Sequence, residues 1–204
     1  YVVPDSWLRG LNGNFINDFL YSSLQVGLLE ELAKLVPFLI ALRIFKKQFD
    51  EPVDYLAYMC CSALGFSAVE NIMYFNNYGA SIIDGRAILS TVGHMFDSSL
   101  VAYGFILHRF HPRKPKFWPT FLSFLGLGAL AHGIYDFILF YVGGVPGYLL
   151  VIVYFLFTVS IFAVILNNSL NNSPYFSYKK VVNSHSVLNQ LISAYVIIFA
   201  AQFI

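Results

Sequence analysis

Hydrophobic residues along this chain form six long runs, and short breaks rich in Pro, Gly and Asn separate them. The hydrocarbon core of a bilayer is about 30 Å thick, so roughly 20 helical residues cross it, and each run is long enough to do so. The pattern predicts an all-α fold, a polytopic membrane helix bundle of about six transmembrane helices with a polar intramembrane site. The expected spans are residues 15–44, 55–74, 87–107, 117–141, 147–166 and 187–204.

No break between the runs is long enough for a further domain, so residues 1–204 are expected to form one membrane-embedded domain, with 1–13 as an interfacial segment. The composition agrees, because 58% of residues are hydrophobic and 11% are charged, whereas a soluble domain has about a quarter charged residues. A formal charge of +1 gives no strongly basic or acidic surface. The lipid bilayer is therefore an expected partner, and nucleic acid is not.

Lys and Arg gather in alternate breaks, which predicts the orientation of the spans. The breaks expected on the inner side hold Arg43, Lys46 and Lys47, then Arg109, Arg113, Lys114 and Lys116, then Lys179 and Lys180. The intervening breaks are almost uncharged, with Asp84 and Arg86 in one of them. Residue 1 is then expected outside, and a chain that starts at Tyr1 is expected to be a fragment.

Ionisable residues occur inside four of the six runs, where each is unfavourable by at least a few kcal/mol unless it is paired or faces water. The first run holds Glu30, Glu31 and Lys34, the second Glu70, the third His94 and Asp97, and the fourth His132 and Asp136. The fifth and sixth runs hold none. This concentration indicates one shared polar site.

Helix geometry places these residues at a common depth. Glu30, Glu70, His94 and His132 each lie about 14 residues from the inner end of their span, which is roughly 20 Å. Glu30 and Lys34 are i,i+4 neighbours with the acid first, the favourable order for an ion pair, so Lys34 is expected to neutralise one carboxylate of the adjacent glutamates. Three glycines beside the polar positions are expected to let helices approach closely, namely Gly65, Gly93 and Gly133.

Such a cavity suits the activation of water. A carboxylate removed from bulk water acts as a general base or acid, and His or Asn donors stabilise the oxyanion of an attacked amide. Glu and His side chains would equally hold Zn²⁺ with an open position for water. The spacing leaves both mechanisms open, since there is no His-Glu-x-x-His helix.

Four motifs resemble the PrsW family of intramembrane proteases, which is related to the CAAX prenyl endopeptidases and the Abi proteins. They are Glu-Glu-x-x-Lys from Glu30, Phe-x-x-x-Glu-Asn from Phe66, the lone His94, and His-x-x-x-Asp from His132, in the family's order. The resemblance implies an intramembrane endopeptidase whose catalytic residues are Glu30, Glu31, Glu70, His94, His132 and Asp136. It leaves a glutamic or a metallo mechanism open; a metalloenzyme would bind Zn²⁺ through Glu70, His94 and His132.

The resemblance also implies a substrate, a membrane-anchored protein such as an anti-sigma factor that receives its first cut, and a place in the bacterial cytoplasmic membrane. Glu70 stands where CAAX endopeptidases have His, so prenylated substrates are not implied. Two functions of other classes remain alternatives. One is a catalytically silent scaffold with the same fold, and the other is an ion- or proton-coupled transporter that uses the buried acids.

Overall fold

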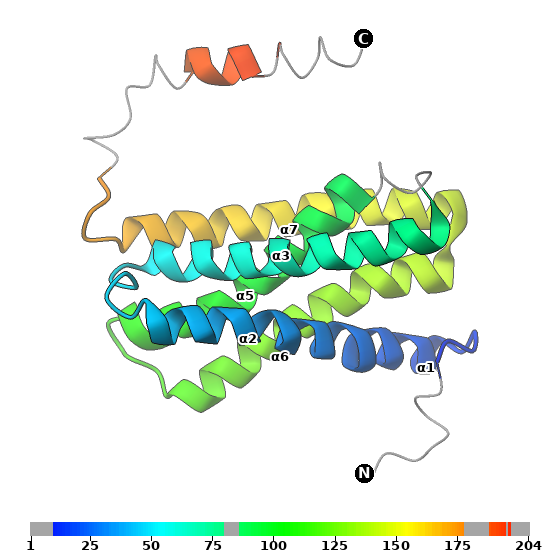
Figure 1. The fold of residues 1–204 in the computed structure, drawn as a ribbon, viewed down its shortest axis with the longest axis horizontal. Helices are drawn as coiled ribbons and strands as arrows, with labels where there is room; N and C mark the ends of the chain where they lie inside the picture. Colours follow the sequence, from blue (N-terminus) through cyan, green and yellow to red (C-terminus); the bar gives the residue numbers. More distant parts are fainter. Residues whose placement is uncertain (1–9, 80–85, 178–187, 195, 197–204) are drawn as a thin grey trace.

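The computed structural model describes residues 10–79, 86–177, 188–194 and 196 (Figure 1). Within these residues the chain is helix and loop, without a strand. The elements are α1 (Phe15–Leu20), η1 (Tyr21–Gly27), α2 (Leu28–Ile44), α3 (Pro52–Tyr78), η3 (Arg86–Ser90), α5 (Thr91–Phe110), α6 (Phe117–Phe137), η4 (Ile138–Val142) and α7 (Gly144–Asn171), where η marks a π-helical segment.

The first five predicted spans are confirmed as helices. The run 15–44 is one continuous helix made of α1, η1 and α2, and the other four extend by a few residues at one or both ends. Within the sixth run residues 188–194 are helical; its remaining expected residues, like 1–9 of the interfacial segment, lie largely outside the described part of the chain.

By length and apolar composition, three helices of the described residues qualify as membrane spans: Pro52–Tyr78, Phe117–Val142 and Gly144–Asn171. The helices of the first and third runs, which contain α2 and α5, are not among these three. The protein is thus an all-α membrane helix bundle, and the count of six transmembrane helices stays a prediction.

Local capping explains where two of the helices begin. The side chain of Asn14 accepts hydrogen bonds from the backbone N–H groups of Ile16 and Asn17, which starts α1 at the predicted residue. A capping box between Glu51 and Asp54, with Pro52 as the first helical residue, starts α3 three residues earlier than predicted.

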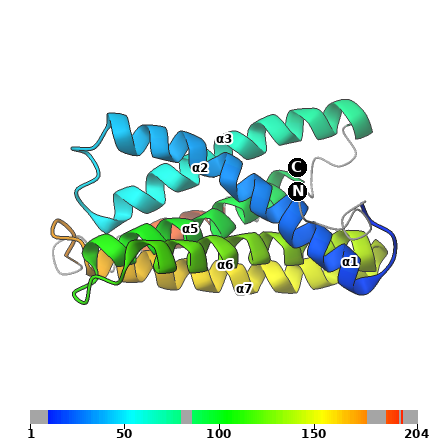
Figure 2. The ribbon, with the colours of Figure 1, turned by 90° about the horizontal axis from the view of Figure 1, so that it is seen from below.

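The helices run lengthwise side by side, with α2 and α3 on one side and α5, α6 and α7 on the other (Figure 2). The long first helix crosses this arrangement obliquely, so that its η1 segment packs against α6 while α2 packs against α3. Helix α5 contacts α3, α6 and α7. Side chains on α5 consequently face three neighbouring helices.

Two glycines allow the closest helix contact near the polar residues. A Cβ on Gly27 would overlap the carbonyl oxygen of Ala129, and a Cβ on Gly133 would overlap Ser23. The prediction for Gly133 is therefore confirmed. The predictions for Gly65 and Gly93 are wrong, because a Cβ at either position meets no atom within 4 Å: neither backbone is pressed against another helix.

The apolar core and the apolar outer surface occupy different parts of the bundle. Phe38, Met59 and Val101 are fully buried in the core beside α5. Large apolar side chains on α7, such as Val153 and Phe157, are more than 60% exposed. Contiguous exposed apolar surface of this kind fits contact with lipid.

Candidate active site

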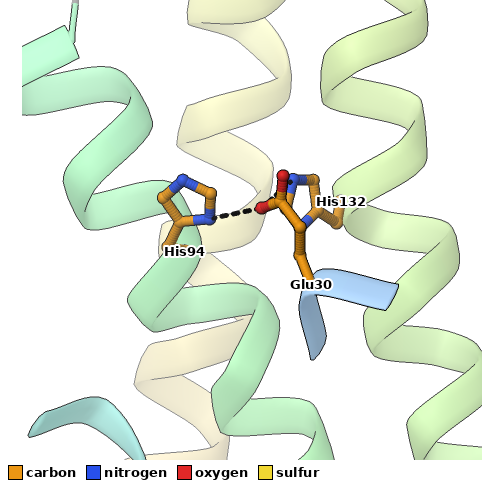
Figure 3. Close-up of side chains that lie close together, drawn as sticks. All are labelled: Glu30, His94 and His132. Atoms are coloured by element: carbon orange, nitrogen blue, oxygen red, sulfur yellow. Dashed lines mark ion pairs between the residues drawn. The ribbon is translucent and has the colours of Figure 1, made fainter. Parts of the chain in front are cut away.

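Three side chains from three helices meet inside the bundle (Figure 3). Glu30 extends from α2, His94 from α5 and His132 from α6. Glu30 Oε2 lies 3.4 Å from His132 Nε2 and 3.9 Å from His94 Nδ1. The two imidazole centroids are 4.9 Å apart. These three residues were expected at a common depth in the membrane, and they lie next to one another.

Glu70, on α3, contacts the opposite nitrogen of His94. Its Oε2 lies 2.9 Å from His94 Nε2. When Nε2 carries the proton and donates it to this carboxylate, Nδ1 keeps a lone pair that faces Glu30. Glu70 therefore orients the His94 ring from outside the three-residue group.

Glu31 and Lys34 form a second layer behind His132, and both side chains are fully buried. Lys34 Nζ lies 2.6 Å from Glu31 Oε1, and Ser98 Oγ donates to Glu31 Oε2 at 2.7 Å. Glu31 Oε1 is also 3.4 Å from His132 Nδ1. The prediction that Lys34 neutralises one of the paired glutamates is confirmed, but its close partner is Glu31 and not the i,i+4 neighbour Glu30, because the Glu31 carboxylate turns toward the ammonium.

Lys34 also joins this layer to the imidazoles. Its ammonium lies 2.9 Å from His94 Nδ1 and 3.3 Å from His132 Nδ1. The distance to Glu30 Oε2 is longer, at 3.9 Å. The buried charge on Lys34 is consequently surrounded by groups that accept hydrogen bonds or carry negative charge.

The Glu30, His94 and His132 side chains border a cavity of about 460 Å³, here named the central cavity. Five of the six expected site residues line it, and Asp97 lines it as well; the five are Glu30, Glu70, His94, His132 and Asp136. Asp136 Oδ2 lies 3.5 Å from His132 Nε2. Aromatic and aliphatic side chains make the rest of the wall, as is usual for a site that binds an organic group. Glu31 is the expected residue that does not line the cavity.

Arg86 is a site residue that the sequence did not reveal, because it was assigned to a polar break. Its guanidinium stacks on the ring of Tyr74 at 3.6 Å from the centroid and lies 2.7 Å from Glu70 Oε2. Its Nε donates to Asn71 Oδ1 at 2.8 Å. The available signal was its position, since a cation in an expected outer break departs from the charge bias of membrane proteins.

Asn71, by contrast, is occupied elsewhere. Its amide nitrogen donates to Thr91 Oγ1 at 2.9 Å while its oxygen accepts from Arg86. The Asn donor that sequence reasoning considered for the oxyanion is therefore used to position Arg86 and η3.

The donor set fits a zinc ion. Glu30, His94 and His132 each offer a ligand atom, and these atoms lie within 4.8 Å of one another. Two imidazoles and one carboxylate are a common protein ligand set of catalytic zinc. Glu30 Oε2 is buried without a hydrogen-bond donor in the described residues, and each histidine has a carboxylate, Glu70 or Glu31, at its other nitrogen.

This group differs from the expected ligand set by one carboxylate. The family resemblance predicts Glu70 with His94 and His132, whereas the structure brings Glu30 between the two imidazoles. The reason is the direction of approach, since Glu70 comes from α3 and reaches the far side of the His94 ring.

Comparison with known families matches residues 2–165 to the family described as PrsW family intramembrane metalloprotease. The chain belongs to the PrsW family. The family resemblance seen in the four motifs is thereby confirmed, and with it the assignment to a family of membrane-embedded peptidases.

Curated PrsW relatives agree. The chain is 32% identical to Protease PrsW of Geobacillus kaustophilus over 119 residues, which cover 57% of this chain and 50% of the relative. It is 33% identical to Protease PrsW of Bacillus subtilis over 141 residues, covering 68% and 60%. The chain thus spans about half the length of the curated relatives it matches. No solved structure matches it significantly.

Proposed function

We propose that this chain is an intramembrane endopeptidase that hydrolyses a peptide bond of a membrane-anchored protein. One observation supports this above all others: Glu30, His94 and His132 converge within 4.8 Å at the wall of a cavity inside an apolar helix bundle. The curated relatives, named Protease PrsW, support the same activity. The proposed location is the bacterial cytoplasmic membrane, which the chain crosses several times.

Hydrolysis of an amide requires a base for the attacking water, donors for the developing oxyanion, and an acid for the leaving amine. Glu30, His94 and His132 would hold Zn²⁺, which when bound supplies a Lewis acid for the carbonyl and a more nucleophilic water. Asp136, on the cavity wall 3.5 Å from His132 Nε2, takes the proton of the water and returns it to the amine.

Second-layer groups keep the imidazoles in place during this proton transfer. Glu70 fixes the His94 ring and Glu31 fixes the His132 ring. Arg86 offers further N–H donors at the cavity wall, where they stabilise negative charge on the carbonyl oxygen. In the glutamic alternative Glu30 itself is the base, and the histidines and Arg86 provide the donors.

A membrane-anchored anti-sigma factor that receives a first cut is the proposed substrate class. A cavity enclosed by helices suits a substrate that enters as an unfolded strand, because a helix would bury its own carbonyl groups. Several apolar side chains of the wall, such as Val26 and Leu139, would contact such a strand.

The proposal is tested by co-expressing the full chain with a tagged membrane-anchored substrate and following the cleaved product. Glu30→Gln and His132→Ala should abolish cleavage while the variants accumulate in the membrane. His111→Ala, a histidine in the exposed loop after α5, is the matched control and should cleave normally. If both cavity variants still cleave, the proposal fails; substrate capture without any cleavage by the wild type would favour the silent scaffold.

Metal analysis separates the two mechanisms. We expect about one zinc per chain in the purified protein, loss of zinc in His94→Ala and His132→Ala, and loss of cleavage on chelation that added zinc restores. Cleavage that continues without bound metal would establish the glutamic alternative.

A further inference from the structure

A second cavity lies at the opposite end of α2 from η1 and shares no lining residue with the central cavity. It measures about 630 Å³ and is here named the basic cavity. Four cationic side chains line it: Arg43 near the end of α2, Lys46 in the following turn, Arg109 near the end of α5, and Lys114 in the loop before α6. His108 adds a fifth nitrogen-bearing side chain.

Among the described residues that line the basic cavity there is no Asp or Glu. Four positive charges around one hollow repel one another, and an anion in the hollow would relieve this repulsion. The central cavity shows a different pattern, because two of its acids lie near cations: Glu70 is 2.7 Å from Arg86, and Glu30 is 3.9 Å from the buried Lys34.

The protein holds two of these groups in fixed positions. Arg109 Nη1 donates to Tyr55 Oη at 2.8 Å, which leaves its other N–H groups for a further acceptor. His108 Nδ1 donates to the carbonyl oxygen of Pro115 at 2.9 Å and ties the loop to α5. Lys114 in this loop has a φ of +40°, a backbone conformation that residues other than Gly, Asn and Asp rarely adopt.

Apolar side chains also line the basic cavity, namely Leu39, Leu42 and Phe105. Its four cations are exposed, whereas Phe105 is buried. Leu39 is 42% exposed, and its neighbours Val36 and Ile40 continue the exposed apolar surface along α2. A hollow with cations at its rim and an apolar strip leading away from it matches an amphiphile, with an anionic head and hydrocarbon tails.

We propose that the basic cavity binds the headgroup of an anionic phospholipid, with the acyl chains lying along Val36, Leu39 and Ile40 of α2. The phosphate is bound by Arg43, Lys46, Arg109 and Lys114, as expected for basic pockets between helices at the membrane surface. A free anion or an acidic peptide would contact the cations but would not contact the apolar strip along α2.

The test measures lipid retention by the purified full chain in detergent. Phosphatidylglycerol and phosphatidylcholine are titrated, bound lipids are counted by native mass spectrometry, and the thermal unfolding midpoint is followed in parallel. The wild type should bind phosphatidylglycerol at least tenfold more tightly than phosphatidylcholine. The pocket variant Arg43→Gln/Lys114→Gln should bind it about 25-fold more weakly, since each cation contributes roughly fivefold.

Arg113→Gln/Lys116→Gln is the matched control. It removes the same charge from exposed residues of the same basic loop, and neither residue lines the cavity. The control should keep its lipid affinity within about twofold, because long-range attraction alone is weakened by salt. Equal losses in both variants would show a general charge effect and overturn the proposal, as would full retention by the pocket variant.

Competitors distinguish the sources of the anion. Inorganic phosphate and glycerol phosphate at millimolar concentration should leave phosphatidylglycerol bound, because they lack acyl chains. Displacement by inorganic phosphate would assign the pocket to a free anion, and displacement by an acidic peptide would assign it to a protein segment; either result overturns the lipid proposal.

Discussion

The central cavity and the basic cavity differ in how their charges are balanced. At the central cavity Glu70 pairs with Arg86 at 2.7 Å, and in the buried layer behind His132 Glu31 pairs with Lys34 at 2.6 Å. In the basic cavity four cations line the wall, and the part of the wall that the structure describes holds no carboxylate. The difference reflects burial, because a buried charge without a partner is strongly unfavourable, whereas the cations of the basic cavity are exposed and solvated.

Removing one buried partner should have the largest effect. Lys34→Met leaves the fully buried Glu31 carboxylate without its cation, and the loss of unfolding free energy should be about 3–5 kcal/mol. Denaturant unfolding in detergent measures it. The double variant Lys34→Met/Glu31→Gln should recover part of the loss, and the exposed Lys47→Met should change stability by less than about 0.5 kcal/mol. A Lys34→Met protein as stable as the wild type would contradict the proposed balance.

Disrupting the helix contact between η1 and α6 beside the central cavity should have the second largest effect on stability. Gly133→Ala places a Cβ against Ser23 of η1 and should destabilise the bundle by about 1–3 kcal/mol. Gly65→Ala is the control in the same kind of helix interior, and it should be neutral or stabilising because its Cβ meets open space. Thermal unfolding of both variants compares them. Equal destabilisation would mean that the contact at Gly133 is not specific.

Removing an orienting carboxylate should weaken zinc binding at the central cavity without unfolding the protein. Glu70→Gln keeps the shape of the side chain but weakens the hydrogen bond to His94 Nε2, so zinc affinity should fall about 10- to 100-fold. Competition with a zinc chelator measures the affinity. Unchanged zinc binding together with unchanged cleavage would remove Glu70 from the site.

Raising the salt concentration should have the smallest effect, and it should affect lipid binding at the basic cavity but not zinc binding at the central cavity. Raising ionic strength from about 0.1 to about 1 M shortens the screening length from roughly 10 to 3 Å. Phosphatidylglycerol binding at the exposed cations should therefore fall several-fold, whereas the zinc content of the central cavity should stay constant. Native mass spectrometry and elemental analysis of the same samples test both. A loss of zinc that parallels the loss of lipid would contradict the conclusion that the central cavity is shielded from salt while the basic cavity is exposed to it.

Hydropathy alone located five helices to within a few residues, and the sixth run is described as helix over 188–194. Helical rise placed Glu30, Glu70, His94 and His132 at one depth, and they do lie around one cavity. Both results depend on distances along a single helix, which local sequence fixes.

The sequence by itself determined the all-helical membrane fold, the level of the polar residues and the family. Only the tertiary structure decided that Glu30 rather than Glu70 stands between the imidazoles, that Lys34 pairs with Glu31, and that Arg86 reaches the cavity. These choices depend on how each helix is rotated and how closely it approaches its neighbours. The π-helical turn at η1 and the contact of Gly27 and Gly133 with the facing helix set that geometry, and no pattern along one helix encodes it.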